Sequence, residues 1–286
     1  MKKRLDPGLI MLLVMIGFGT LPLFVRRIAL SSPELALCRA VIAAALLGLY
    51  LLATGQRIPF RAIRREAPLV ILSGALMGVN WILLFQAYRY TTVSAATLSY
   101  YFAPVLVTAA CPVIFHERLT KKQILCFVMS TVGLLLISDL TGLGGGSRDG
   151  LGLLFGFGAA VLYATVILLN KFIKNVEGIH RTFLQFLAAI AILVPYVAAS
   201  GGLHLGVLDA AGWASLLTVG AIHTGVAYCL YFSALRHLTG QRTAILSYAD
   251  PLVACLLSVT VLGEAMSPRQ VLGGALILGF TLWNEL

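Results

Sequence analysis

Long apolar runs separated by short polar connections repeat along the whole chain. A helix needs roughly 20 mostly apolar residues to cross the hydrocarbon of a bilayer. The runs are continuous, whereas the strands of a membrane barrel alternate apolar and polar positions, so the pattern predicts helices. The predicted spans cover about residues 8–30, 34–54, 68–88, 93–115, 123–138, 150–170, 179–199, 211–235, 243–262 and 270–284.

Composition supports a membrane protein. Apolar residues make up 59% of the chain and charged residues 11%, against about 25% charged residues in a soluble domain. The first run follows Lys2, Lys3 and Arg4 and resembles a signal peptide, but it is long and lacks a clear cleavage site. We therefore interpret it as a retained span.

The two halves of the chain are related by an internal repeat. Residues 78–135 align without a gap with residues 225–282, at a constant offset of 147. The matched positions include two pairs of uncommon membrane residues, Tyr101 with Tyr248 and Pro104 with Pro251. The predicted units are a first repeat over residues 1–140, a Gly-rich linker over 141–149 and a second repeat over 150–286.

Basic residues predict the orientation of the spans. With the N-terminus inside, fifteen Lys and Arg residues lie on the inner side and five on the outer side, while Arg39 falls within the second span. Five spans per half is an odd number, so the second half runs through the bilayer inverted relative to the first. The predicted fold is an all-α integral membrane protein of ten transmembrane helices in two inverted five-helix repeats, with both termini cytoplasmic. The formal charge of +10 reflects this topology rather than nucleic-acid binding, because no aromatic-basic module accompanies it.

The chain offers little for metal, cofactor or covalent chemistry. His116 and Glu117 resemble part of a zinc-protease helix, but Thr120 stands where the second histidine is required. A Gly-x-Ser-x-Gly elbow is also missing. The five cysteines form no close pair and no metal spacing; they are Cys38, Cys111, Cys126, Cys229 and Cys255. We therefore expect no metal, no cofactor and no enzyme activity.

The fourth predicted span carries the clearest polar pattern. Its polar positions are three or four residues apart and share one helical face; they are Ser94, Thr97, Tyr101, Pro104 and Thr108. In each repeat a tyrosine precedes a proline by three residues, and we expect the pseudo-twofold axis to bring Tyr101 and Tyr248 together. A proline in mid-span removes a backbone hydrogen bond and can kink the helix or form a hinge. The alternative is that both prolines only shape helix packing.

Other polar and aromatic residues lie at a similar depth in the predicted spans. The substrate-binding candidates among them are Asn80, Trp81, Tyr163 and His223, with Phe18, Thr20, Gln86 and Tyr228 as further cavity candidates. A single buried histidine is also compatible with a purely structural hydrogen bond, and Trp81 with contact to lipid.

Two ionisable residues lie deep within predicted spans. An uncompensated charge in hydrocarbon costs several kcal/mol, so Arg39 and Asp250 should face the interior and find partners. One interpretation is a structural ion pair or hydrogen-bonded network. In the other, Asp250 holds a substrate ammonium or a coupling proton and Arg39 holds a carboxylate. Glu117 and Glu264 lie near the ends of matching spans and are predicted to anchor loops in closed states on opposite sides of the membrane.

The repeat and its motifs resemble the EamA-type permeases of the drug/metabolite transporter (DMT) superfamily. The resemblance rests on Leu262, Gly263 and Glu264 followed by Gln270, Gly273, Gly274 and Gly279, on Glu117, Thr120 and Gln123 of the first copy, and on Arg39 in the second span. It implies a cavity lined by the third, fourth, eighth and ninth helices and flanked by the first and sixth. Asp250 directly before Pro251 departs from the commoner pattern of the family.

The expected function is secondary transport of a small organic metabolite across the bacterial inner membrane. An amino acid or amine-like solute, exported by alternating access, is the main hypothesis, with the lipid bilayer and a coupling proton or ion as partners. Aromatic faces also bind cationic heads, so uptake of choline or another quaternary ammonium is the alternative. A channel and an intramembrane enzyme are further readings from other classes. The short tail after the last span is also compatible with a truncated chain.

Overall fold

The computed structural model describes residues 6–56, 60–115, 120–137, 148–176, 178–235, 237–238, 246–247 and 249–286. Glu117, Tyr248 and most of the predicted linker, residues 141–147, lie outside the described residues. The side chain of Pro104 is also not described.

The described secondary structure is helical. The longer helices of the first half are α1 (Pro7–Val25), α2 (Ser32–Ala53), α3 (Phe60–Tyr90), α4 (Val93–Tyr100), α5 (Ala103–Phe115) and α6 (Lys121–Ile137). Those of the second half are α7 (Arg148–Phe172), α8 (Gly178–Ala199), α9 (Ala210–Leu217), the π-helix η2 (Thr218–Val226), α10 (Ala227–Leu235), α12 (Ala249–Thr260) and α13 (Pro268–Glu285). A short 3-10 helix, η1 (Leu205–Val207), precedes α9.

Polar side chains fix where several helices begin. Ser31 and Glu34 form a capping box at the start of α2, and Ser267 and Gln270 form another at the start of α13. Both boxes satisfy backbone N–H groups that have no partner within the helix. Pro33 and Pro268 lie within two residues of these serines, in the first turn of each helix, where the fixed φ of proline is favourable. The ends of these spans are therefore encoded locally.

Six described helices are long and apolar enough to cross a bilayer, judged by length and composition. They cover the first, second, third, sixth, seventh and eighth predicted spans. The other four predicted spans correspond to helices that are shorter or less apolar. The count of ten transmembrane helices therefore remains a prediction, while the all-helical fold is confirmed for the residues that the structure describes.

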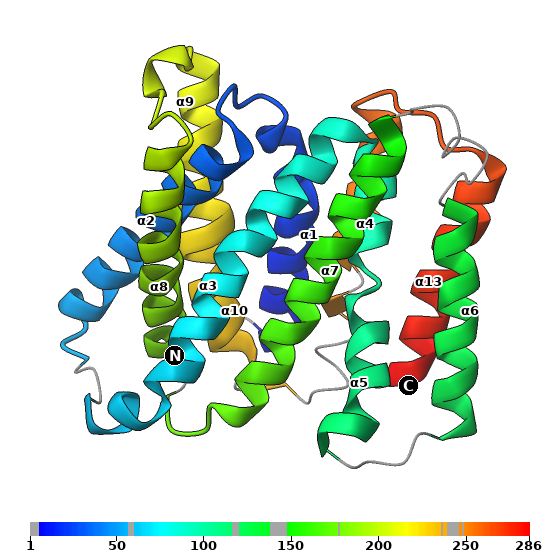
Figure 1. Cartoon of the computed structure of the whole chain (residues 1–286), viewed down its shortest axis with the longest axis horizontal. Coiled ribbons are helices and arrows are strands. Elements are labelled where there is room, and N and C mark those ends of the chain that lie inside the picture. Colours follow the sequence, from blue (N-terminus) through cyan, green and yellow to red (C-terminus); the bar gives the residue numbers. More distant parts are fainter. Residues whose placement is uncertain are drawn as a thin grey trace.

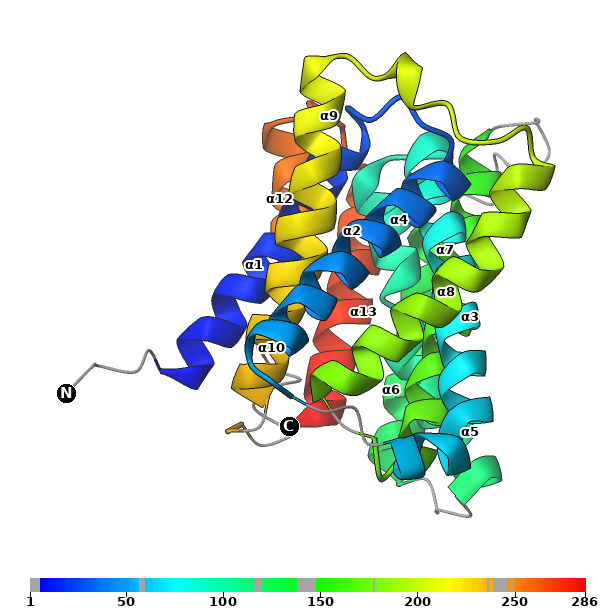
Figure 2. The same cartoon turned by 90° about the vertical axis from the view of Figure 1, so that its left-hand side faces the viewer.

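The two halves are interleaved rather than side by side. Figures 1 and 2 show α3 running along α7 and α8, and α6 pairing with α13. α1 packs against α12 and α10, and α2 packs against α8 and η2. Each of these pairs joins a helix of the first half to a helix of the second, so the space between the halves lies at the centre of the bundle. α1 begins and α13 ends at the same end, low in Figure 1.

Glycines allow the closest of these helix contacts. A Cβ atom added to Gly74 of α3 would clash with the carbonyl oxygen of Gln185 in α8. In the same way, a Cβ atom on Gly133 of α6 would lie 2.6 Å from the carbonyl oxygen of Gly273 in α13. Small residues let the backbones of membrane helices approach closely, and dispersion contacts between the backbones then stabilise the pair.

The fourth predicted span is broken in two. The chain leaves the helix at Tyr101 and Phe102, and α5 begins at Ala103. Pro104 thus falls in the first turn of a new helix, where its missing N–H costs no hydrogen bond. The predicted mid-helix kink is replaced at Pro104 by a helix break, because a proline is better accommodated at a helix start than in a helix interior.

A π-helix interrupts the eighth predicted span. The hydroxyl of Thr224 donates to the carbonyl oxygen of Val219 at 2.7 Å, and Nδ1 of His223 lies 3.2 Å from the carbonyl oxygen of Thr218. Both side chains therefore reach carbonyl groups five residues earlier, which the wider turn makes accessible. π-helical turns are rare and are frequent at functional sites.

Candidate functional site

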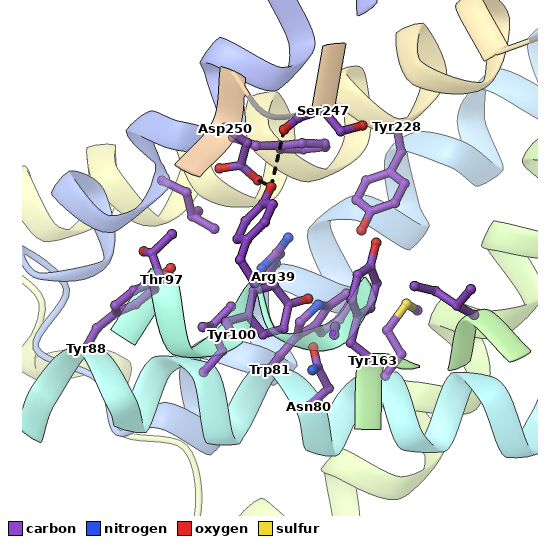
Figure 3. Close-up of a pocket in the computed structure, with 17 residues that line it drawn as sticks. Arg39, Asn80, Trp81, Tyr88, Thr97, Tyr100, Tyr163, Tyr228, Ser247 and Asp250 are labelled. Atoms are coloured by element: carbon purple, nitrogen blue, oxygen red, sulfur yellow. Dashed lines mark hydrogen bonds between the residues drawn. The ribbon is translucent and has the colours of Figure 1, made fainter. Parts of the chain in front are cut away.

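A cavity of about 300 Å³ lies between the two halves (Figure 3). Its lining comes from α1, α2, α3, α4, α5, α7, α10 and α12, from Tyr101 at the break between α4 and α5, and from Ser247. Ligand pockets span about 300 to 1,000 Å³, so this volume suits a small metabolite. The cavity brings together five of the predicted substrate-binding residues that the structure describes: Asn80, Trp81, Tyr101, Tyr163 and Asp250.

Aromatic rings form much of the cavity wall. The ring centroids of Tyr100 and Tyr163 are 5.3 Å apart, and those of Phe18 and Tyr228 are 5.7 Å apart. Figure 3 shows the side chains of Tyr163 and Tyr228 pointing toward one another from α7 and α10. The wall therefore offers aromatic faces together with phenolic hydroxyl groups, which suits a solute with one apolar and one polar part.

Asp250 and Tyr101 connect the two halves across the cavity. The Tyr101 hydroxyl donates to Oδ2 of Asp250 at 2.8 Å, and lies 3.4 Å from the carbonyl oxygen of Ser247 (Figure 3). The repeat counterpart of Asp250 is Ala103, which also lines the cavity. The duplicated frame thus carries a carboxyl group at one of these two equivalent positions and a methyl group at the other.

Arg39 lines the cavity from α2, although its exposed fraction is only 4%. Its Nε donates to the hydroxyl of Thr224 in η2 at 2.7 Å. Its guanidinium carbon lies 4.6 Å from the ring centroid of Trp81 and 5.6 Å from that of Phe85. Arg39 is thereby held by a hydrogen bond and by two cation–π contacts. The sequence assigned it a structural or gating role, and the structure places it at the cavity.

Asn80 and Trp81 lie on α3 and are buried, as the sequence predicted for residues that face the interior. Nδ2 of Asn80 donates to the carbonyl oxygen of Ala159 in α7 at 2.6 Å. The Asn80 side chain therefore also joins the two halves. Trp81 is 4% exposed, which shows that it faces the protein interior rather than lipid.

His223 does not line the cavity in this conformation. It is buried in η2, and both ring nitrogens have partners within the protein. Nε2 lies 2.8 Å from the hydroxyl of Thr20 in α1, and Nδ1 lies near the carbonyl oxygen of Thr218. This arrangement is a structural network between α1 and η2, and contact of His223 with a substrate stays a prediction.

The sequence analysis did not identify two residues that the structure places at the site, Tyr100 and Thr224. Tyr100 lines the cavity beside Tyr101, although neighbouring positions of a regular helix point in different directions. The helix break directly after Tyr100 lets both rings reach the cavity. Thr224 gave no signal, because a single threonine in an apolar span does not reveal that its hydroxyl holds Arg39.

Glu264 ties the two halves together at the end of the bundle that the charge count predicts to be outside. Its Oε1 lies 2.6 Å from Nη1 of Arg26, and its Oε2 accepts the N–H of Val93, the first residue of α4, at 2.8 Å. Ser258 also donates to Oε2. Glu264 belongs to the second half, whereas Arg26 and Val93 belong to the first.

The sequence profile of the EamA-like transporter family matches the chain twice, over residues 7–139 and 150–284. The uncharacterized transporter YxxF of Bacillus subtilis is 31% identical over 96% of this chain and 88% of its own length. The protein RarD of Streptomyces exfoliatus is 25% identical over 94% of this chain and 85% of its own length. A solved crystal structure that is 20% identical has a TM-score of 0.64 and covers 96% of this chain and 95% of that chain, which shows a shared fold.

Proposed function

Because this multi-pass membrane protein belongs to the EamA-like transporter family, we propose that it carries a small organic metabolite by alternating access. The proposed solute is an amino acid or a related amine, and the proposed direction is outward across the bacterial inner membrane. The observation that supports this most directly is a small aromatic cavity that both halves build around one carboxyl group. In transporters built from two repeats, one half can rock against the other around a site between them, which exposes that site to each side of the membrane in turn.

Asp250 is the proposed recognition group for a cationic nitrogen. Arg39 and Asp250 are the charged side chains among the described residues that line the cavity. Oδ2 of Asp250 accepts from Tyr101, and Oδ1 has no hydrogen-bond partner in the described part of the chain. A substrate ammonium or a coupling proton at Asp250 would neutralise its charge, so substrate and proton would compete for the same carboxylate.

Quaternary ammonium compounds are the second candidate class. Tyr100, Tyr101, Tyr163 and Tyr228 present aromatic rings to the cavity, and such rings attract a cation within about 6 Å of a ring centroid. Choline, whose cationic head cannot donate an N–H bond, would rely on these rings more than on Asp250. Uptake of such a compound is the alternative to export of an amino acid.

Glu264 is proposed to hold the predicted outer end closed, with Glu117 doing so at the opposite end in the other state. Replacing Glu264 with glutamine removes the charge that pairs with Arg26 and weakens the bond to the Val93 N–H. We expect the outward-open population to rise about tenfold, because a charged hydrogen bond contributes about 1.5 kcal/mol. Spin labels at Arg27→Cys and Ala265→Cys, two exposed positions at this end, would report the change as a new population at longer distance.

The matched control for this experiment is Arg269→Gln, which changes an exposed charge at the same end of the bundle. It should leave the distance distribution unchanged. A Glu264→Gln distribution that coincides with that of the parent protein would refute the latch.

Counterflow in proteoliposomes tests the proposed function. Vesicles are loaded with one unlabelled compound from a panel of amino acids, choline and related amines, and uptake of the labelled compound is followed. Transient accumulation that saturates with concentration would support a carrier and name its substrate class. Absence of counterflow for the whole panel, with the protein shown to be folded and inserted, would refute the amino-acid and amine assignment.

A further inference from the structure

Arg39 has hydrogen-bonding capacity that the protein does not use. Its Nε is bonded to Thr224, but its two terminal nitrogens contact no hydrogen-bond acceptor and no carboxylate in the part of the chain that the structure describes. Both terminal nitrogens carry N–H groups that can donate hydrogen bonds. The side chain lines the cavity, although its exposed fraction is only 4%.

The guanidinium plane is held in a fixed orientation. Thr224 binds Nε, and Thr224 is itself fixed by its bond to the carbonyl oxygen of Val219 in η2. Trp81 and Phe85 of α3 contact the guanidinium as cation–π partners. These contacts use Nε and the flat face of the guanidinium. The N–H groups of the two terminal nitrogens, which form a fork, are left for a ligand in the cavity. Such a fork matches the geometry of a carboxylate.

Burial without a counter-anion is costly. A buried charge without a counter-ion strongly destabilises a membrane protein, and cation–π contacts offset only part of this cost. A structural role of Arg39 would be served by a carboxylate on a neighbouring helix, and none contacts it among the described residues. An anionic group of a bound solute would supply the missing partner.

We propose that Arg39 binds the carboxylate of the transported solute, so that the substrate is a zwitterion with one carboxylate and one cationic nitrogen. This proposal rests on the proposed function and narrows its substrate class. Arg39 belongs to α2 in the first half and Asp250 to α12 in the second, so one zwitterion would bridge the halves. A simple amine would leave Arg39 unpaired, and a dianion would leave excess negative charge beside Asp250.

Trp81 provides a direct binding signal, because its ring contacts the Arg39 guanidinium at the cavity. The chain has three tryptophans, and Trp213 and Trp283 lie on α9 and α13, away from the cavity lining. A Trp213→Phe, Trp283→Phe protein therefore reports from Trp81 alone. Its fluorescence would be titrated with two matched pairs of probes: L-phenylalanine against phenethylamine, and glycine betaine against choline. The members of each pair differ in the carboxylate.

The carboxylated probe of at least one pair is expected to bind about 10 to 100 times more tightly than its partner. This range is the fold-change that corresponds to a charge-assisted hydrogen bond. In Arg39→Gln protein the two members of that pair should bind equally, whereas Arg39→Lys should keep part of the preference. Thr224→Val leaves Arg39 in place but removes its Nε partner, so it should weaken binding of the carboxylated probe and spare the other.

The remaining outcomes overturn the proposal in distinguishable ways. If phenethylamine or choline binds as tightly as its carboxylated partner, Arg39 does not bind a substrate carboxylate. The proposal that the protein carries an amine would then still stand. If Arg39→Gln protein still binds the carboxylated probe more tightly than its partner, a group other than Arg39 binds the carboxylate. If all four probes fail to change the fluorescence of folded protein, both the zwitterion and the proposed amino-acid or amine substrate are wrong.

Discussion

Replacing Asp250 with asparagine is expected to lower transport of a cationic or zwitterionic solute by about two orders of magnitude. The substitution keeps the shape of the side chain and its hydrogen bond with Tyr101, but it removes the negative charge that opposes the substrate nitrogen. Loss of a charged hydrogen-bond partner in a desolvated site costs about 3 kcal/mol, which corresponds to about a hundredfold. The initial rate of counterflow at equal amounts of reconstituted protein measures the effect.

Asp209→Asn is the matched control for Asp250→Asn. Asp209 caps α9, where its Oδ1 accepts the N–H of Gly212 at 2.7 Å, and asparagine is an equally good capping residue. Transport should be unchanged by this substitution. Transport by Asp250→Asn protein at the rate of the parent would exclude Asp250 from both substrate binding and proton coupling.

Replacing Gly74 with alanine is expected to destabilise the protein by about 1 to 3 kcal/mol, the usual cost of overpacking. The new methyl group would clash with the carbonyl oxygen of Gln185 and would lie 2.8 Å from Cβ of Ala188, so α3 and α8 must separate. Separation would also weaken the hydrogen bond from Gln185 to Ser73, which is 2.7 Å long. Thermal unfolding in detergent would show a lower midpoint than that of the parent.

Gly17→Ala provides the comparison for Gly74→Ala. Gly17 lies within α1, and a Cβ atom there would meet nothing within 4 Å. Alanine has a higher helix propensity than glycine, so this variant should be unchanged or slightly more stable. Equal stability of the two variants would show that α3 and α8 do not pack as closely as described.

Much of the fold follows from local signals in the sequence. The predicted second span, residues 34–54, is observed as α2, Ser32–Ala53, because a continuous apolar run marks it in the sequence. The breaks in helical geometry were not predictable in this way. Pro104 predicts a distortion of the fourth span, but hydropathy averages over a whole span and does not predict a break at Tyr101 and Phe102 or the π-helix η2.

The candidate site was predicted in part. Tyr101 and Asp250 were expected to face the interior because polar groups are costly in lipid, and they form a hydrogen bond across the two halves. The pairing of Arg39 with Thr224 could not be predicted, since it joins residues 185 positions apart whose contact depends on how α2 packs against η2. His223 met the same depth criterion as Tyr101, but depth does not reveal which side of a helix faces the cavity.

The duplication indicates which residues correspond but not which of them touch. Aligned positions such as Ala103 and Asp250 differ in chemistry, and both line the cavity. The contact between Tyr101 and Asp250 joins positions that are not repeat partners. The asymmetry of the site therefore arises from substitutions within an otherwise duplicated frame.

Protection of a cavity thiol by the solute tests the central claim most directly, which is that the cavity between the halves is the substrate site. In a protein whose five cysteines are replaced, Met77→Cys would place one thiol in the cavity lining, and His204→Cys would place one on the exposed surface as a control. With the solute identified by counterflow at ten times its Kd, alkylation of the Met77→Cys thiol should slow about tenfold. The His204→Cys thiol should react at an unchanged rate. An unchanged rate at Met77→Cys, in protein that transports the solute, would contradict the account.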